Sequence, residues 1–308
     1  MRVISAAEIN ATLDFPGLIA AIGDAFRAGV SAPPRHHHRI GQATLLLMPA
    51  WQAAGGGFIG VKLVSVFPDN ATRALPTVMG TYVLMAGDSG APLAALDGVS
   101  LTLWRTAATS ALAADTLARP EASRLAMIGA GALAPYLIRA HASVRRLNRV
   151  TIWNRTFERS ERVAAEVAEI GIKATATSDR ADAIRGADIV SVATLSEAPL
   201  VEGAWLKPGT HVDLVGAYTP AMREADDEAV RRASVYVDTR GGMRESGDIA
   251  QPLASGALSE GRIAGDLFDI AAGRARRRSA DEITLFKSVG YAAEDLAGAV
   301  EVWRRLNP

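Results

Sequence analysis

The chain has 308 residues, 49% of them apolar, and its 33 basic residues balance its 33 acidic ones. A chain of this length can bury a large core and favours two domains over one, while the balanced charge gives no reason to expect a nucleic acid or a membrane surface as a partner. The absence of cysteine excludes disulfides, thiolate metal ligands and cysteine nucleophiles. The first residues are too polar for a signal peptide, and no apolar run approaches the roughly 18 residues that span a bilayer, so we expect a cytoplasmic protein.

The first third of the chain combines helical and strand patterns. Apolar residues at helical spacing over 6–28, interrupted near Pro16, predict one or two short helices. The paired prolines of "SAPPRHHHR" predict a loop, because proline cannot continue a helix. The alanine-rich segment 102–117 predicts a further helix. Strands are expected at 43–51, 57–67 and 76–86.

From Arg124 onward, strand and helix patterns alternate. Strands are expected at 124–128, 149–153, 172–176, 188–193, 211–215 and 234–238. This alternation is typical of a doubly wound parallel sheet with helices between its strands. The chain closes with a long amphipathic helix within "ITLFKSVGYAAEDLAGAVEVWRRL". The predicted fold class is therefore α/β.

The sequence "RLAMIGAGALAPYLIRAH", from Arg124, has the pattern of a dinucleotide-binding turn between a strand and a helix. Gly129 would permit the tight turn, Gly131 would let the backbone approach a pyrophosphate, and Ala134 would keep helix and strand close. Pro135 fits only in the first helical turn, where its missing N–H costs nothing. The alternative is a structural turn that binds no ligand.

The end of the next strand indicates which dinucleotide would bind. An acid that bonds the adenosine ribose is expected about 20 residues further on, but the chain has Asn154, Arg155 and Thr156 there, with Arg159 one turn later. A carboxylate would repel a 2′-phosphate, whereas a guanidinium binds one. We therefore expect NADP(H) to be preferred, with NAD(H) possible. The alternative is that both arginines are merely exposed charges.

Two smaller signals concern Thr194 and the histidines at 36–38. Thr194 follows a predicted strand, and ligands bind at the carboxyl ends of strands in a doubly wound sheet, which makes it a candidate for the nicotinamide side. Three consecutive histidines suggest a metal site, but on an extended loop they point in different directions, and no carboxylate cluster accompanies them. We therefore predict no metal site.

Taken together, these motifs resemble those of the ornithine cyclodeaminase/mu-crystallin family over essentially the whole chain. The segments that carry the resemblance are "PPRHHHRIGQATLLLMPAW", "GVKLVSVFPDN", "PTVMGTYVLMAGDSGAPLAALDG", "LTLWRTAATSALAA", the glycine turn, "VGAYTPAMRE" and "TLFKSVGYAAEDLAGA". Members include ornithine cyclodeaminase, ketimine reductases, Δ1-pyrroline-2-carboxylate reductases and an alanine dehydrogenase branch. The motifs are most similar to those of the pyrroline-2-carboxylate (ketimine) reductase branch.

The resemblance implies a homodimer and a two-domain organisation. Residues 1–117, completed by 285–308, would form an α+β substrate-binding and dimerisation domain. Residues 118–284 would form a Rossmann NADP-binding domain inserted into it.

The resemblance also implies the site residues. Arg35, Lys62 and Arg105 match positions that hold the substrate carboxylate and lie near the reacting carbon, and Val289 matches a substrate contact. The positions that match cofactor contacts are Thr77, Ala132, Leu133, Asn154, Thr194 and Ser288.

The chemistry of the three cations agrees with this assignment. Arginine holds a carboxylate with a planar bidentate fork, and three cations from separate segments would repel one another without an anion to bind. Lys62, within "FIGVKLVSV", is expected on a strand, where desolvation and neighbouring cations would lower its pKa to a range suited to proton transfer. The alternatives are surface charges for Arg35 and Arg105, and for Lys62 an edge position with its ammonium in water.

The chain departs from the cyclodeaminase pattern at functional positions. Tyr218 stands where ornithine cyclodeaminase has the aspartate that serves deamination, and a phenol is neutral at pH 7. Met222 replaces a lysine, and Asn154 replaces the acid expected at the ribose. These departures favour a simpler reaction without deamination, in which Tyr218 closes the substrate pocket, forms a hydrogen bond near the substrate ring, or merely packs.

The function expected from the sequence is NAD(P)H-dependent reduction of a cyclic imino acid. Hydride transfer to the C=N bond of Δ1-pyrroline-2-carboxylate or Δ1-piperideine-2-carboxylate would give L-proline or L-pipecolate. Three alternatives remain open: ornithine cyclodeaminase, an alanine-type amino acid dehydrogenase, and a non-enzymatic NADPH- or ligand-binding protein of the crystallin kind.

Overall fold

The structure is a computed structural model that describes residues 1–52, 57–73 and 75–307. The chain divides into two compact units, one of residues 1–106 with 290–308 and the other of residues 107–289. The boundaries differ from those predicted at 117 and 285. The first falls inside a helix, and the second follows a strand that the sequence patterns did not reveal.

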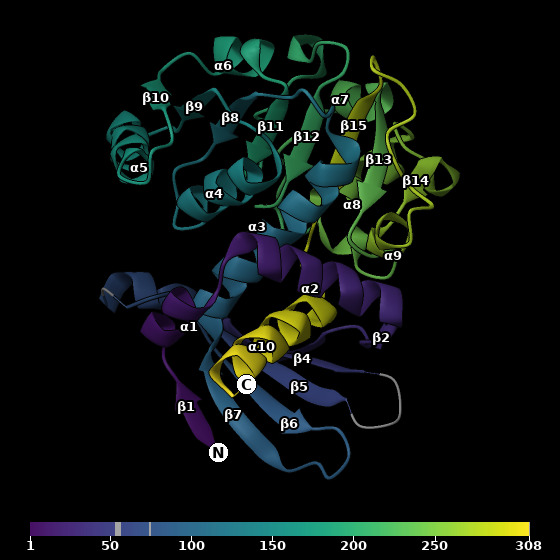
Figure 1. Ribbon diagram of the computed structural model, residues 1–308. Helices are drawn as coiled ribbons and strands as arrows, with labels where there is room; N and C mark the ends of the chain where they lie inside the picture. The colour runs from purple at the N-terminus through teal and green to yellow at the C-terminus, as the bar shows by residue number, and fades with distance from the viewer. Residues whose placement is uncertain (53–56, 74, 308) are drawn as a thin grey trace. The chain divides into compact units, whose positions relative to one another are not determined.

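The first unit is a mixed sheet covered by helices (Figure 1). Its strands are β1 (Arg2–Ile4), β2 (Val30–Ser31), β3 (His36–Ile40), β4 (Ala43–Gln52), β5 (Phe58–Val66), β6 (Val78–Ala86) and β7 (Pro92–Asp97). Its helices are α1 (Ala6–Thr12), α2 (Phe15–Ala28), α10 (Ala292–Leu306) and the first part of α3 (Gly98–Leu117). The sheet order is β1-β7-β6-β5-β4-β2, and β3 also pairs with β4. β4 to β7 are antiparallel, and β1 joins β7 in parallel.

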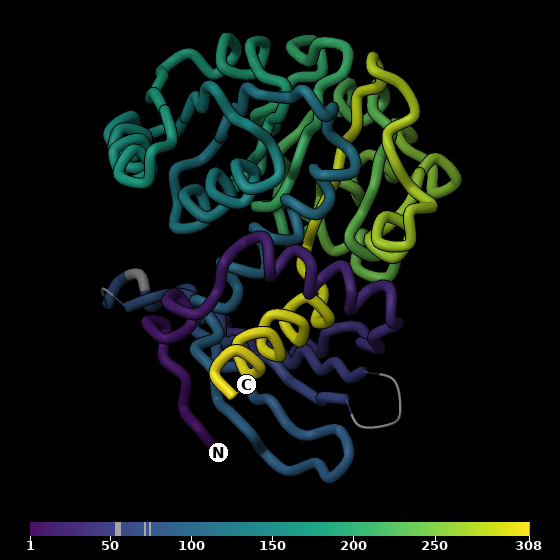
Figure 2. Tube along the Cα trace, viewed as in Figure 1, coloured from purple at the N-terminus to yellow at the C-terminus, as the bar shows by residue number. Residues whose placement is uncertain are grey.

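Local capping explains why two helices form near the N-terminus. Ser5 and Glu8 form a capping box that begins α1. Asp14 then caps α2 by accepting a hydrogen bond from the Gly17 amide, and Pro16 lies in the first turn. The predicted interruption near Pro16 is therefore the boundary between two helices. Figure 2 shows the purple N-terminal helices beside the yellow C-terminal helix, and α2 contacts α10 directly.

The second unit is a parallel sheet of eight strands with helices packed against it. Its strands are β8 (Arg124–Ile128), β9 (Arg149–Trp153), β10 (Ala174–Thr177), β11 (Ile189–Val192), β12 (His211–Leu214), β13 (Ala233–Val237), β14 (Ile263–Gly265) and β15 (Ile283–Lys287). Its helices are α4 (Ala134–Val144), α5 (Phe157–Ala168), α6 (Arg180–Gly186), α7 (Asp227–Arg232), α8 (Gly247–Ser255), α9 (Leu267–Ala271) and the remainder of α3. The order is β10-β9-β8-β11-β12-β15-β13-β14. The α/β class and the doubly wound sheet are thus confirmed.

The strand order reverses between β8 and β11, which is where a doubly wound sheet binds its ligand. Both strands are almost wholly buried, and Ile128, Val190 and Val192 belong to the core of this unit. β15 pairs with β12 and β13, so residues 285–287 belong to this sheet and not to the first unit as predicted.

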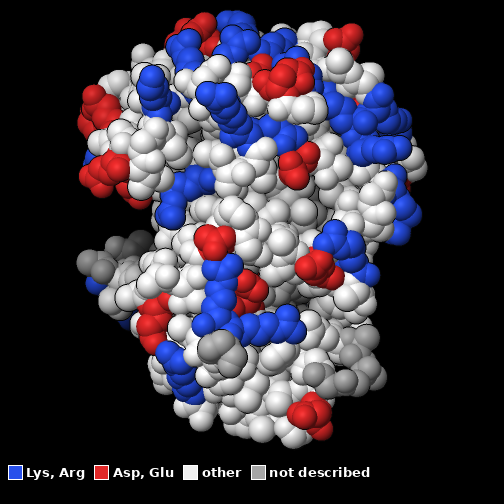
Figure 3. Space-filling model, viewed as in Figure 1, with Lys and Arg blue, Asp and Glu red and all other residues white. Residues whose placement is uncertain are grey.

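The surface carries charges of both signs. Lysine and arginine side chains are interspersed with aspartate and glutamate on the face drawn in Figure 3. Among the described residues, none of the helices is both long and apolar enough to cross a bilayer.

Candidate active site

Lys62 lies in the middle of β5, a central strand of the first unit's sheet. Its neighbours across the sheet are Met48 on β4 and Tyr82 on β6. The side chain is 3% exposed, and its Nζ lies 2.8 Å from Asp295 Oδ2 and 3.4 Å from Thr102 Oγ1. The alternative of an edge lysine with its ammonium in water is therefore wrong.

Arg105, on α3, is also buried and lies beside the same acid. Its Nη1 is 2.5 Å from Glu294 Oε2, and its Nε is 2.9 Å from Asp295 Oδ1. Both carboxylates are fully buried in the first turn of α10, where the helix dipole favours negative charge. Asp295 therefore connects Arg105 to Lys62.

Arg35 joins this cluster through Gly290. Its Nη2 donates a hydrogen bond of 2.6 Å to the Gly290 carbonyl. Gly290 has a φ of +86°, and a Cβ there would lie 2.7 Å from Arg105 Nη1. A side chain at Gly290 would displace the Arg105 guanidinium and strain the left-handed backbone. Arg35, Lys62 and Arg105, from three distant segments, thus lie in one cluster.

Carboxylates neutralise part of the positive charge of this cluster. Lys62 and Arg105 pair with the two carboxylates of Glu294 and Asp295, and Arg35 donates to the Gly290 carbonyl beside them. The pKa of Lys62 falls from 10.5 to about 8, chiefly through burial and next through Arg105 and Arg35, against the opposing effect of Asp295. The arginines suit a substrate that carries a carboxylate, and the lowered pKa suits Lys62 to proton exchange near neutral pH.

The two buried acids correct the expectation that only an external anion could balance the cations. The sequence does contain a signal for them. In "YAAEDLAGA", adjacent acids interrupt an apolar helix at its first turn, where Glu294 also completes a capping box with Tyr291. Two acids in a buried helix need cations as partners.

The glycine turn of the second unit has the geometry that a dinucleotide requires. Gly129 has a φ of +110°, and a Cβ there would lie 2.4 Å from the carbonyl oxygen of Ala193, directly after β11. At Gly131 an added Cβ would meet nothing within 4 Å. The turn is thus tight where it meets the sheet and open where a pyrophosphate would approach.

The helix that follows offers free donors. α4 begins at Ala134 with Pro135 in its first turn, and Leu133 at its N-cap makes no side-chain cap bond. Within the described part of the chain, the amides of Gly131, Ala132 and Leu133 donate no hydrogen bond to protein. Unpaired amides at the N-terminus of an 11-residue helix favour a phosphate.

The residues after β9 lie beside this turn. Asn154 accepts a hydrogen bond of 3.3 Å from the Ala130 amide and donates one of 2.9 Å to the Thr156 carbonyl. Arg155, Thr156 and Arg159 are exposed, and neither guanidinium has a carboxylate partner among the described residues. Two unpaired arginines beside a phosphate turn suit a further phosphate group.

Two buried acids bind residues that follow other strands of this sheet, at the carboxyl ends of those strands. Glu224 Oε1 accepts hydrogen bonds from the amide and the hydroxyl of Thr194, of 2.7 and 2.9 Å. Asp238 Oδ2 accepts one of 2.7 Å from the Val289 amide and one of 3.3 Å from the Ser288 hydroxyl. Neither acid was predicted from the sequence, since each is a single acid in a loop or at a strand end.

Two predicted residues stand apart from these contacts. Tyr218 is 42% exposed, in the loop after β12. Thr77 is exposed in the first unit, and its carbonyl accepts a hydrogen bond of 2.8 Å from the Phe67 amide. Its predicted role as a cofactor contact stays a prediction.

The histidines at 36–38 lie on strand β3, which pairs with β4, and not on a loop as predicted. Of the residues that the structure describes, no three His, Asp or Glu side chains are grouped so as to hold a metal ion.

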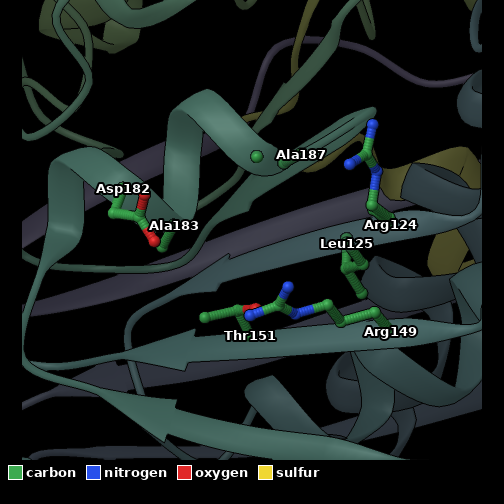
Figure 4. Close-up of a pocket in the computed structure, with 8 residues that line it drawn as sticks. Arg124, Leu125, Arg149, Thr151, Asp182, Ala183 and Ala187 are labelled. Carbon is green, nitrogen blue, oxygen red and sulfur yellow. The ribbon is translucent and has the colours of Figure 1, made fainter.

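Two cavities of the second unit lie away from these residues. A cavity of about 40 Å³ lies between the amino ends of β8 and β9 and helix α6, lined by Arg124, Arg149 and Asp182 among others (Figure 4). A shallower one of about 430 Å³ borders the edge strand β10. Neither contains a residue of the candidate site.

The chain is similar to known proteins along almost its whole length. The model of the ornithine cyclodeaminase/mu-crystallin family matches residues 2–307. A Δ1-pyrroline-2-carboxylate reductase of Paracoccus denitrificans is 41% identical over 256 residues, 82% of this chain and 80% of that protein. The solved structure of the Thermococcus litoralis Δ1-pyrroline-2-carboxylate reductase, in complex with NADH and L-proline, has a TM-score of 0.93 at 31% identity and covers 99% of this chain and 97% of its own.

An archaeal alanine dehydrogenase dimer with bound NAD has the same TM-score of 0.93, at 28% identity, and covers 99% of this chain and 95% of its own. The fold is therefore shared by relatives with different reactions. The full-length family match and the identity to the Paracoccus reductase show that this chain belongs to the ornithine cyclodeaminase/mu-crystallin family.

Proposed function

We propose that this protein is an NADPH-dependent reductase of cyclic imino acids. It would convert Δ1-pyrroline-2-carboxylate or Δ1-piperideine-2-carboxylate to L-proline or L-pipecolate. The observation that carries the proposal is the cluster of three cations, in which the half-buried Arg35 lies with the buried Lys62 and Arg105. Relatives that reduce pyrroline-2-carboxylate support it.

The substrate's carboxylate is assigned to the arginines. Arg35 and Arg105 flank Gly290 and present donors to one small anion. The carboxylate of a cyclic imino acid is an anion of this kind. Val289, adjacent to Gly290, would contact the apolar ring, and Tyr218 would close the pocket.

Lys62 is assigned the proton. When bound, the reduced nicotinamide supplies a hydride for the carbon of the C=N bond. Reduction of the imine also needs one proton at nitrogen, and the Lys62 ammonium can donate it because its pKa lies at about 8. Asp295, 2.8 Å from Nζ, would hold the ammonium in place and favour its charged form.

The cofactor is assigned to the glycine turn of the second unit. The free amides at Gly131, Ala132 and Leu133 fit a pyrophosphate. NADPH is preferred in this proposal because Asn154 replaces an acid and because Arg155 and Arg159 are exposed and unpaired by any described carboxylate. Thr194, Ser288 and Thr77 are proposed as further contacts, with Thr156 beside the adenosine.

We also propose that the protein is a homodimer. One face of the first unit's sheet is apolar, with cross-strand rows such as Pro49–Val61–Val83 and Trp51–Ile59–Met85. Its side chains are only partly buried within one chain. A second copy would cover this face, and the archaeal alanine dehydrogenase is a dimer.

A spectrophotometric screen tests the function. Purified protein is mixed with NADPH or NADH and with five- and six-membered cyclic imino acids, pyruvate plus ammonia or methylamine, or ornithine. We expect NADPH to be consumed stoichiometrically with a cyclic imino acid. Ammonia released from ornithine without net redox change would indicate a cyclodeaminase, consumption with pyruvate and ammonia an alanine dehydrogenase, and binding without turnover a ligand-binding protein. Each of these outcomes contradicts the proposal.

A further inference from the structure

Three charged side chains that the proposed reaction does not use are buried together in the second unit. Glu224, Asp248 and Lys287 are each fully buried. Lys287 Nζ lies 3.1 Å from Asp248 Oδ2 and 3.8 Å from Glu224 Oε2. Burying charges is costly even when they are paired, so a core of this kind needs a reason beyond stability.

Glu224 holds two loops at the carboxyl edge of the sheet. One oxygen, Oε1, accepts from the amide and hydroxyl of Thr194, after β11. The other, Oε2, accepts from the amides of Gly216 and Ala217, after β12, at 2.8 and 3.2 Å. One carboxylate therefore fixes the relative position of two adjacent loops.

These loops are packed backbone against backbone. A Cβ at Gly216 would lie 2.0 Å from the Thr194 carbonyl oxygen. The spacing between the loops is thus set by a glycine and by the length of one glutamate side chain. Thr194 cannot move without breaking two hydrogen bonds to Glu224.

Asp248 holds the backbone of Glu224, and Lys287 lies 3.8 Å from its carboxylate. Asp248 Oδ1 accepts a hydrogen bond of 2.7 Å from the Glu224 amide. Lys287 is the last residue of β15 and precedes Ser288, which in turn donates its amide to Leu214 of β12. Burial raises the pKa of Glu224 to about 7, and Lys287 opposes this rise. Because both glutamate oxygens accept from N–H donors, the ionised form matches the geometry.

We propose that Glu224 is a positioning residue for the nicotinamide end of the dinucleotide, with Lys287 as its counter-ion. It acts through Thr194 and the 216–217 loop and does not touch the cofactor. The inference rests on the proposed function, because it takes the carboxyl edge of this sheet to bind the nicotinamide. The carboxylate of Glu224 accepts its hydrogen bonds from Thr194 and the 216–217 loop and not from the glycine turn at the phosphate end.

The substitution Glu224→Gln tests this with little change in volume. The glutamine side chain has one oxygen and one NH2 group. In either orientation, its NH2 group would face the N–H or O–H donors of one of the two loops, and that loop would lose its hydrogen-bond acceptor. The nicotinamide end should be misplaced while the phosphate end stays intact. We expect kcat to fall by about 100-fold and NADPH to bind about tenfold more weakly, with its characteristic bound-state fluorescence reduced.

A fragment and a control separate positioning from folding. The affinity for 2′,5′-ADP, which lacks the nicotinamide, should change less than about twofold in E224Q. Asp213→Asn is the matched control: Asp213 is another fully buried acid of this sheet, bonded to Ser191 and His141 and not to either loop. We expect D213N to lower the melting temperature without changing NADPH fluorescence. If E224Q does not fold, Glu224→Asp keeps the charge opposite Lys287 and shortens only the reach, so the same differences are expected, in milder form.

The outcomes are distinct. Parent-like kcat and NADPH fluorescence in E224Q, or equal weakening of NADPH and 2′,5′-ADP, would overturn the positioning role while the reductase function stands. A parent protein that binds NADPH but reduces no cyclic imine would overturn the function, and the binding measurements would still decide the role of Glu224. A parent that binds no dinucleotide contradicts both.

Discussion

The charge of Lys62 depends on opposing effects on its pKa, and Asp295 is the neighbour that favours the charged form. Burial and the two arginines lower its pKa to about 8, and Asp295 raises it. The ammonium is therefore present below about pH 8 and lost above it. If it donates the proton to the imine, kcat/KM for reduction should fall as the pH rises through about 8.

The substitution Asp295→Asn should shift this falling limb of the pH profile toward lower pH. Removing the carboxylate 2.8 Å from Nζ removes the effect that raises the pKa of Lys62, so we expect the limb to shift by about one unit or more toward lower pH. The pH profile of kcat/KM measures it. Thr102→Val, which removes a contact of 3.4 Å but no charge, should leave the limb in place. A limb that stays put or moves to higher pH in D295N would show that Lys62 is not the titrating group.

Gly290 offers a second test at the scale of one residue. Gly290→Ala should raise KM for the imino acid by at least about tenfold, because the new Cβ would lie 2.7 Å from Arg105 Nη1 and displace the guanidinium. Its left-handed backbone adds roughly 1–2 kcal/mol of destabilisation.

The matched control is Gly256→Ala. Gly256 has a φ of +78°, and an added Cβ there would meet nothing within 4 Å. Both variants should lose similar stability in thermal unfolding, and G290A alone should raise KM. An unchanged KM in G290A would mean that Arg105 does not hold the substrate at this position.

Single residues show how far the sequence alone can indicate a site. Arg35, Lys62 and Arg105 were assigned by resemblance, and the structure brings them together. The amphipathic pattern of the last helix indicates its apolar face and does not by itself single out Glu294 and Asp295. Glu224 could not be found at all, since its role depends on loops that only the fold brings together.

The proposed preference for NADPH rests on one element, the β9–α5 connection. The double variant Arg155→Ala, Arg159→Ala should weaken NADPH about tenfold or more and leave NADH unchanged, because hydrogen bonds to a charged group are worth about 1.5–3 kcal/mol each. Binding titrations with both nucleotides measure this. Arg162→Ala removes an exposed arginine further along α5 and should have no effect. Equal affinity of the parent protein for NADH and NADPH would contradict the assignment.

The elements differ in how well their patterns reveal them. β8 and β9 match the predicted ranges because each is a short apolar run next to a turn. β15, "ITLFK", is buried at every position, and a wholly buried strand carries no alternation that separates it from a helix. β3 is exposed along its length, so its histidines lack the apolar positions that signal a strand.

At the scale of the molecule, pattern alone could not predict the division of the chain. Both ends of the sequence belong to one unit, and residues 107–289 form the other. No local sequence pattern indicates that α10 packs with the helices at the start of the chain. Only the resemblance to the family implies it. The exact boundaries depend on strand pairing, because β15 belongs to the eight-stranded sheet through its pairing with β12 and β13.

The association of two chains is the last test, and it concerns the apolar sheet face of the first unit. Leu63 is 37% exposed and lies opposite Leu47 and Thr81 on the face away from Lys62. If a second copy covers this face, a symmetric dimer of the Leu63→Asp variant would bury two aspartates, one from each chain. Each unpaired buried charge costs several kcal/mol. We expect the parent protein to sediment as a dimer and L63D as a monomer at micromolar concentration. Ile170→Asp, at a site 55% exposed in the other unit, should remain dimeric. A monomeric parent, or a dimer that L63D leaves intact, would exclude this face, because a hydrophobic interface cannot bury unpaired carboxylates without a large loss of stability.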